Sequence, residues 1–136
     1  MGRILALDYG RKRTGIAVTD ELRLIASGLT TVATNELFSF LEDYFNTEIV
    51  EQLVVGEPKQ MNNEPSESED LIKSFLKKFT EKFPLIPVGR QDERFTSKMA
   101  KSSMIAGGMG KKKRQNKALV DEISATLILQ AYLNRV

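Results

Sequence analysis

Two acidic residues stand where the surrounding sequence is apolar. Asp8 ends the short run Ile4-Leu5-Ala6-Leu7, which is typical of a strand buried on both faces. Asp121 lies near the start of the apolar segment 118–133, and helical spacing places it on the same face as Ala125. A carboxylate beside apolar surroundings is costly unless a cation or hydrogen bonds offset it. Both positions are therefore candidates for binding a cation.

Each acid also has a purely structural explanation. Asp8 could accept hydrogen bonds in the turn that follows at Gly10. Asp121 could interact with the dipole of its helix, an effect of about 0.3–1 kcal/mol. Glu122 could serve that purpose equally well from the solvent side, so the dipole alone does not explain why Asp121 faces inward.

The composition limits the available chemistry to oxygen ligands. The 136 residues include no cysteine and no histidine, which excludes disulfides, thiolate or imidazole zinc sites and an imidazole general base. Carboxylates and water are the ligands that Mg²⁺ and Mn²⁺ prefer. A metal site in this chain is therefore expected to hold one of these two ions.

Length and hydropathy predict a single domain over residues 1–136. No apolar run approaches 18 residues, and no charged segment precedes a short apolar stretch as in a secretory signal. We therefore expect a cytoplasmic protein that does not associate with a membrane. Nothing in the sequence indicates its oligomeric state.

Charge is unevenly distributed along the chain. Residues 35–82 contain eleven acids and five lysines, whereas residues 89–117 contain nine basic residues and two acids. A loop with three glycines, 106–110, precedes the densest basic run, and a fold that brings this run near the turn at residues 11–13 would suit a polyanion. Lysine runs are also common in solvated loops. The candidate nucleic-acid-binding residues are Arg11, Lys12, Arg13, Arg94, Lys111, Lys112, Lys113 and Arg114.

Hydrophobic periodicity predicts an α/β protein. The expected strands are 3–8, 14–19, 26–32, 52–56 and 85–89, and the expected helices are 36–46, 67–83 and 118–133, with another helix capped by Thr96 or Ser97. Pro87 inside the fifth strand indicates an edge of the sheet. The order of elements predicts an antiparallel meander joined by crossovers to parallel strands.

Five motifs together give the chain a resemblance to a known family. They are Leu5-Ala6-Leu7-Asp8-Tyr9-Gly10, Thr14-Gly15-Ile16-Ala17-Val18-Thr19-Asp20, Val54-Val55-Gly56-Glu57-Pro58, Asp92-Glu93-Arg94-Phe95-Thr96-Ser97 and Val120-Asp121. The chain resembles the YqgF family of Holliday-junction-resolvase-like proteins, the pre-16S rRNA nucleases of bacteria. The similarity covers essentially the whole sequence, and the Asp-Glu-Arg-x-Thr-Ser motif is the most distinctive part.

The resemblance implies an RNase H-like fold, with a five-stranded mixed sheet in the order 3-2-1-4-5 flanked by helices. It also implies a nuclease site in which Asp8, Glu93 and Asp121 hold two Mg²⁺ or Mn²⁺ ions for hydrolysis of a phosphodiester. The implied function is maturation of the 5′ end of pre-16S rRNA, with nucleic acid and pre-ribosomal particles as partners. Glu57 departs from the aliphatic residue usual in the family, and it is either a further metal ligand or a loop acid.

Three other functions are compatible with the same residues. One is a Holliday junction resolvase that acts on branched DNA, and another is a nucleic-acid-binding assembly factor without catalytic activity. The third is an actin-like ATPase, because Asp8-x-Gly10 followed by Thr14-Gly15 resembles a phosphate-binding hairpin. That fold needs a second domain to close over nucleotide, which 136 residues do not provide.

Overall fold

A computed structural model of the chain describes residues 2–58, 68–92 and 116–134. Its elements are β1 (Arg3–Tyr9), β2 (Arg13–Thr19), β3 (Ala26–Ala33), a short 3-10 turn (Thr34–Glu36), α1 (Leu37–Thr47), β4 (Val50–Glu57), α2 (Ser68–Lys82), β5 (Val88–Asp92) and α5 (Lys117–Leu133). Apart from β5 and the 3-10 turn, which was not predicted, these elements begin and end within two residues of the predicted positions. No helix in the described ranges is long and apolar enough to cross a membrane.

The five strands form one mixed sheet in the order β3-β2-β1-β4-β5, as predicted. Strand β1 pairs antiparallel with β2 and parallel with β4, and β4 pairs parallel with β5. The carboxyl ends of β1, β4 and β5 consequently meet at one edge of the sheet. Asp8, Glu57 and Asp92 lie at or next to these ends.

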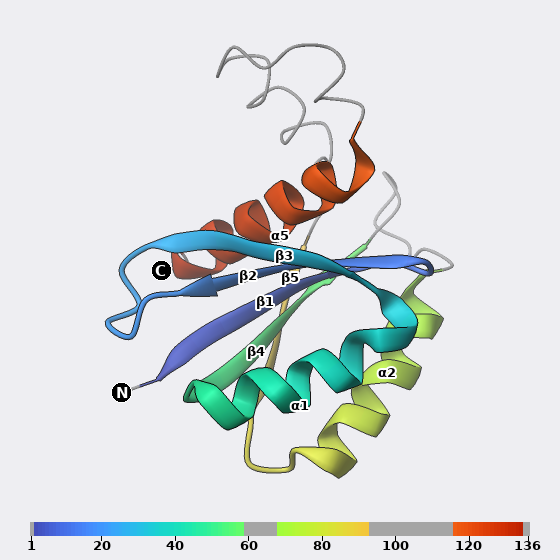
Figure 1. Cartoon of the computed structure of the whole chain (residues 1–136), viewed down its shortest axis with the longest axis horizontal. Helices are drawn as coiled ribbons and strands as arrows, with labels where there is room; N and C mark the ends of the chain where they lie inside the picture. Colours follow the sequence, from blue (N-terminus) through green and yellow to red (C-terminus); the bar gives the residue numbers. More distant parts are fainter. Residues whose placement is uncertain (1, 59–67, 93–115, 135–136) are drawn as a thin grey trace.

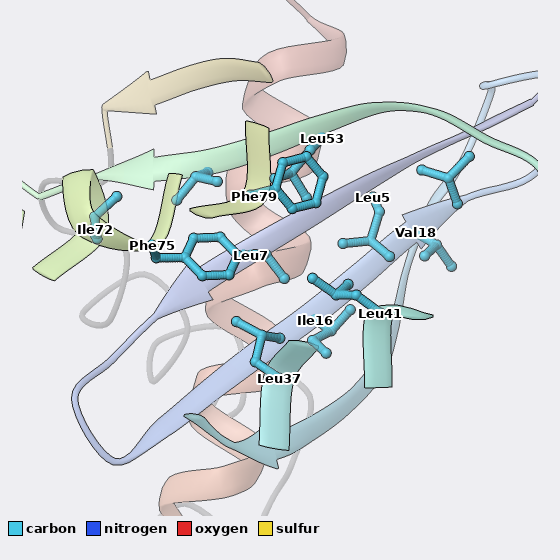
Figure 2. Close-up of a cluster of buried hydrophobic side chains, with 12 residues drawn as sticks. Leu5, Leu7, Ile16, Val18, Leu37, Leu41, Leu53, Ile72, Phe75 and Phe79 are labelled. Carbon is cyan, nitrogen blue, oxygen red and sulfur yellow. The ribbon is translucent and has the colours of Figure 1, made fainter. Parts of the chain in front are cut away.

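Helices α1 and α2 cover one face of the sheet (Figure 1). Alternate residues of the strands, including Leu5, Leu7 and Leu53, pack there against Leu41 of α1 and Phe79 of α2 (Figure 2). All five side chains are fully buried. This larger core therefore fixes the position of β1, the strand that carries Asp8.

Helix α5 covers the opposite face of the sheet (Figure 1). The intervening strand residues Ile4, Ala6 and Ala17 pack there against Ala125 and Ile128 of α5. The small residues at this interface let the helix approach the sheet closely. Ala125 and Ile128 face inward as predicted, but Glu122, expected on the solvent side, has its side chain against Gly28 of β3.

The fifth strand is an outermost strand of the sheet as predicted, but it begins three residues later than expected. The predicted strand 85–89 is wrong because Leu85 is 93% exposed in a turn, and pairing with β4 is confined to Val88–Asp92. Pro87 precedes the strand, and its carbonyl oxygen accepts a hydrogen bond from Leu53 N at 3.0 Å. The helix expected from Thr96 or Ser97 lies outside the described residues.

Candidate active site

Asp8 lies near the carboxyl end of the central strand, on the face covered by α5. Side chains alternate between the two faces of a strand, so Asp8 follows Ile4 and Ala6, which both pack against α5. Its side chain is half-buried, whereas the preceding residues of β1 are buried. The strand therefore presents a carboxylate at the edge of the core that α5 covers.

Gly15 determines how closely α5 approaches Asp8. In the antiparallel register of β1 and β2, Gly15 is the direct partner of Asp8, so the two positions face the same side of the sheet. A Cβ atom on Gly15 would lie 2.0 Å from the backbone oxygen of Asp121 and 3.0 Å from the backbone nitrogen of Glu122. The backbone of α5 at Asp121 and Glu122 therefore occupies the space that a side chain at position 15 would need. This contact brings the backbone of Asp121 beside Asp8.

The start of α5 is anchored to the sheet by further contacts. Asn116 caps the helix, its side chain accepting a hydrogen bond from Leu119 N at 3.2 Å. Thr31 of β3 donates a hydrogen bond through Oγ1 to the carbonyl oxygen of Ala118 at 2.6 Å. These bonds fix the helix terminus, and with it the position of Asp121, relative to the strands.

Arg13 forms an ion pair with Asp121. Its Nε atom donates a hydrogen bond to Asp121 Oδ2 at 2.9 Å, and the two side chains are 40% and 25% exposed. A partly exposed pair of this kind contributes about 0.2–1 kcal/mol. A predicted phosphate-binding residue therefore contacts a predicted metal ligand directly.

Thr34 holds the basic turn between β1 and β2. Its backbone nitrogen donates to the carbonyl oxygen of Lys12 at 2.9 Å, and its hydroxyl donates to the carbonyl oxygen of Gly10 at 2.6 Å. Arg11 and Lys12 are exposed on this turn. Two cations are consequently presented at the sheet edge where Asp8 lies.

Glu57 lies at the same edge but in the register of the other face. It follows Leu53 and Val55 at the spacing of two, and both of these pack toward α1 and α2. Its partner on β5 is Asp92. By strand alternation, Glu57 and Asp8 therefore belong to opposite faces of the sheet.

Arg90, counted above among the basic residues of 89–117, is part of the fold rather than of an exposed surface. Its guanidinium donates to both carboxylate oxygens of Glu69, at 2.7 and 3.1 Å, and to the carbonyl oxygens of Val55 and Gly56. Glu69 is only 5% exposed. This ion pair ties the first turn of α2 to the carboxyl end of β4.

Several predicted site residues lie outside the described residues: Glu93, Arg94, Lys111, Lys112, Lys113 and Arg114. Among the residues that the structure does describe, no group of three acids is close enough to hold a metal ion. Asp8 and Asp121 supply only oxygen donors, and the absent side chain of Gly15 allows them to lie on adjacent backbone segments. This donor set fits a hard divalent cation.

Sequence reasoning missed the positioning roles of Gly15, Thr31 and Thr34. A glycine inside a strand often marks the close approach of another backbone, so the contact at Gly15 could have been predicted from the sequence. The roles of the two threonines could not have been predicted, because their partners are backbone carbonyls distant in sequence.

The sheet order, the acid near the end of its central strand and the acid near the start of the covering helix define the RNase H-like fold class. The profile of the RuvX family, described as Holliday junction resolvase, matches residues 2–135. The chain belongs to this family.

Curated relatives match nearly the whole chain. A protein of Christiangramia forsetii is 68% identical over 133 residues, covering 98% of both chains. One of Flavobacterium psychrophilum is 62% identical over 135 residues, covering 99% of this chain and 98% of its own. One of Bacteroides thetaiotaomicron is 59% identical over 133 residues, covering 98% and 96%. All three are named "Putative pre-16S rRNA nuclease".

Proposed function

We propose that this protein is a nuclease that uses Mg²⁺ or Mn²⁺, held by Asp8, Glu93 and Asp121, to hydrolyse phosphodiesters of structured nucleic acid. The observation that carries the proposal is the contact of Gly15 with the backbone of Asp121, because it places two carboxylates on adjacent segments of one face. Glu93 is the next residue in the sequence after Asp92, which ends β5 at the edge where Asp8 lies.

In such a site the acidic residues bind the metal ions and the basic residues bind the phosphates of the substrate. When bound, the ions supply a nucleophile at neutral pH and neutralise charge that develops on the phosphodiester. Asp8 and Asp121 hold them, and no imidazole base is needed, which suits a chain without histidine. Arg11 and Lys12 contact phosphates beside the scissile bond, which positions the substrate without reading its sequence.

The names of the relatives favour pre-16S rRNA as the substrate. Cleavage at its 5′ end, within a cytoplasmic pre-ribosomal particle, is the part of the proposal that rests on the family resemblance alone. The family description favours branched DNA as the second candidate. Specificity between them must come from the shape of the nucleic acid or from a partner, because backbone contacts carry no sequence information.

A cleavage assay with Mn²⁺ tests the proposal. The substrates are an RNA spanning the 5′ end of pre-16S rRNA and a four-way DNA junction, each compared with its linear duplex. We expect the wild type to cleave the RNA, and Asp8→Asn to abolish cleavage while changing nucleic-acid affinity by no more than a few fold. Asp43→Asn, which alters an exposed acid of α1, is the matched control.

Each result has a definite reading. Cleavage of the junction alone would replace the RNA substrate by branched DNA. Binding without cleavage by the wild type would favour an assembly factor, and equal activity of Asp8→Asn and wild type would reject the site. Glu57→Gln tests the further ligand, and its register on the opposite face predicts retention of activity.

Thermal melts examine the metal site without any substrate. Millimolar Mn²⁺ is expected to raise the melting temperature of the wild type by mass action, and to raise that of Asp8→Asn much less. Equal shifts in the two proteins would mean that the ions bind elsewhere. The basic run is tested separately, by replacing Lys111, Lys112 and Lys113 with alanine. We expect the slope of log K against log salt concentration for duplex binding to fall by about 0.9 per lost phosphate contact.

A further inference from the structure

A hollow of about 390 Å³ lies on the face of the sheet opposite to Asp121. It is bounded by the end of β1, the basic turn, the start of α1 and the middle of α2. Tyr9, Arg11, Phe38 and Lys78 are among the residues that line it. The rings of Tyr9 and Phe38 pack against the larger core, but neither that core nor the metal site explains why exposed cations lie beside them.

Aromatic rings form one wall of the hollow. The ring of Phe75 is buried, with its centroid 5.1 Å from that of Tyr9 and 5.0 Å from that of Phe38. Tyr9 and Phe38 are only partly buried, so both expose ring surface to the hollow. Packing against Phe75 limits their rotation, so they offer preorganised surfaces on which a planar group can stack.

Positively charged side chains line the remainder of the hollow. Arg11 and Lys78 are exposed, and no acidic residue is among the described residues that line the hollow. Other cations of the described segments, such as Arg3, Arg23 and Lys82, are each paired with a carboxylate. The hollow therefore complements a ligand that is aromatic and anionic.

The hollow adjoins the proposed nuclease site along the chain. Tyr9 follows Asp8, and consecutive residues of a strand face opposite sides of the sheet about 3.8 Å apart at Cα. A strand of nucleic acid that crosses this edge can place one phosphate near Asp8 and an adjacent nucleotide on the other side. Paired bases cannot reach the rings, because their faces are already stacked within the duplex.

We propose that this hollow binds an unpaired nucleotide of the substrate, its base stacked on Tyr9 and Phe38 and its phosphate held by Arg11 and Lys78. The inference rests on the proposed nuclease function and adds a requirement to it, namely a single-stranded segment next to the scissile bond. Selection would then depend on unpaired structure rather than on base identity, because every base has a face that can stack.

Binding of a fluorescein-labelled oligouridylate, measured by anisotropy in EDTA, tests this subsite without any cleavage. Tyr9→Leu and Phe38→Leu are each expected to raise the Kd about tenfold, as for the loss of one base-stacking contact. Tyr9→Phe keeps the ring and is expected to keep the affinity. A fully paired RNA duplex is expected to bind all four proteins equally.

Two lysines of α2 provide a matched pair for the charge. Lys78 lines the hollow, whereas Lys77 is equally exposed on the same helix but lines a different surface. Lys78→Ala is expected to weaken binding. It should also reduce the slope of log K against log salt concentration by about 0.7, the value for one phosphate contact to a single strand. Lys77→Ala is expected to change neither quantity.

The outcomes separate this inference from the nuclease proposal. Two results would overturn the subsite whatever the cleavage assay shows. One is an equal loss of oligouridylate affinity in Lys78→Ala and Lys77→Ala. The other is unchanged affinity in Phe38→Leu and in a folded Tyr9→Leu. If Asp8→Asn cleaves normally while the ring variants lose affinity for single strands, the metal site is wrong and the subsite stands. Circular dichroism melts of every variant verify that the compared proteins are folded.

Discussion

Arg13 Nε donates a hydrogen bond to Asp121 Oδ2 at 2.9 Å, across 108 residues of sequence. The guanidinium therefore sits on an oxygen that a divalent cation would use. A cation and Arg13 cannot both take the full donor capacity of that atom, so metal binding must weaken or displace the ion pair. Released from Asp121, Arg13 becomes available to a phosphate.

Arg13→Gln tests this competition. We expect it to increase Mn²⁺ affinity several-fold in isothermal titration without nucleic acid, because a positive charge and a competing donor leave Asp121. Nucleic-acid affinity in the presence of Mn²⁺ is expected to fall. Arg23→Gln, which removes an arginine from an ion pair with Glu51 instead, is the control. Unchanged or reduced Mn²⁺ affinity in Arg13→Gln would show that Arg13 supports the site rather than competing for it.

Gly15→Ala is expected to destabilise the protein by about 1–3 kcal/mol or more, because the new Cβ overlaps the backbone oxygen of Asp121 and must displace the start of α5. The Mn²⁺-dependent rise in melting temperature should shrink as well. Gly28→Ala is a close control, because there the Cβ meets only the side chain of Glu122 of the same helix, which can rotate away. Similar urea midpoints for the two variants would contradict the positioning role of Gly15.

Glu69→Ala is expected to cost about 3–5 kcal/mol in chemical denaturation, because it leaves the guanidinium of Arg90 partly buried without its carboxylate. Asp70→Ala removes a neighbouring exposed acid from the same helical turn and should cost much less. Comparable losses in both variants would mean that the charge of the helix terminus matters, rather than the ion pair.

Asp20 provides a prediction on pH dependence. Hydrogen bonds from the backbone nitrogens of Ile25, Leu24 and Leu22 lower the pKa of its carboxyl below the ordinary value of 3.8. A lowered pKa stabilises the fold above the unfolded-state pKa, and this contribution is lost as the pH falls through the folded-state pKa. Asp20→Ala should therefore melt lower than the wild type at neutral pH. The difference should narrow in acid; a constant difference across that range would show that the carboxylate charge is not responsible.

The sheet order was predictable because local patterns and the family resemblance agree. Apolar runs marked the buried strands, and Pro87 placed the last of them at an edge. The start of β5 was not predictable from Leu85 and Ile86, whose apolar character suggested a strand. Pairing with β4 decides that boundary, and such pairing is a tertiary property.

The positions of Asp8 and Asp121 in the fold were predictable from the sequence, whereas the contacts of the nearby basic residues were not. Burial explains the difference, because an acid at the end of an apolar run is conspicuous in sequence, whereas a basic residue is ordinary anywhere on a surface. Arg13 was predicted to bind phosphate and Arg90 belonged to a basic stretch, yet each contacts a carboxylate in the fold. Only the three-dimensional positions of Glu69 and Asp121 distinguish them from Arg11.

Helix α5 joins the sheet across a long separation in sequence, and this has a consequence for the order of events during synthesis. Contacts between distant residues form late because closing the intervening chain costs entropy. Asp8 is made early, but its neighbour Asp121 arrives only with α5, which also covers Ile4, Ala6 and Ala17. A nascent chain on the ribosome therefore does not bring the backbone of Asp121 beside the strand that carries Asp8 until this helix has emerged and docked. An activity that requires both Asp8 and Asp121 must then wait until α5 has docked.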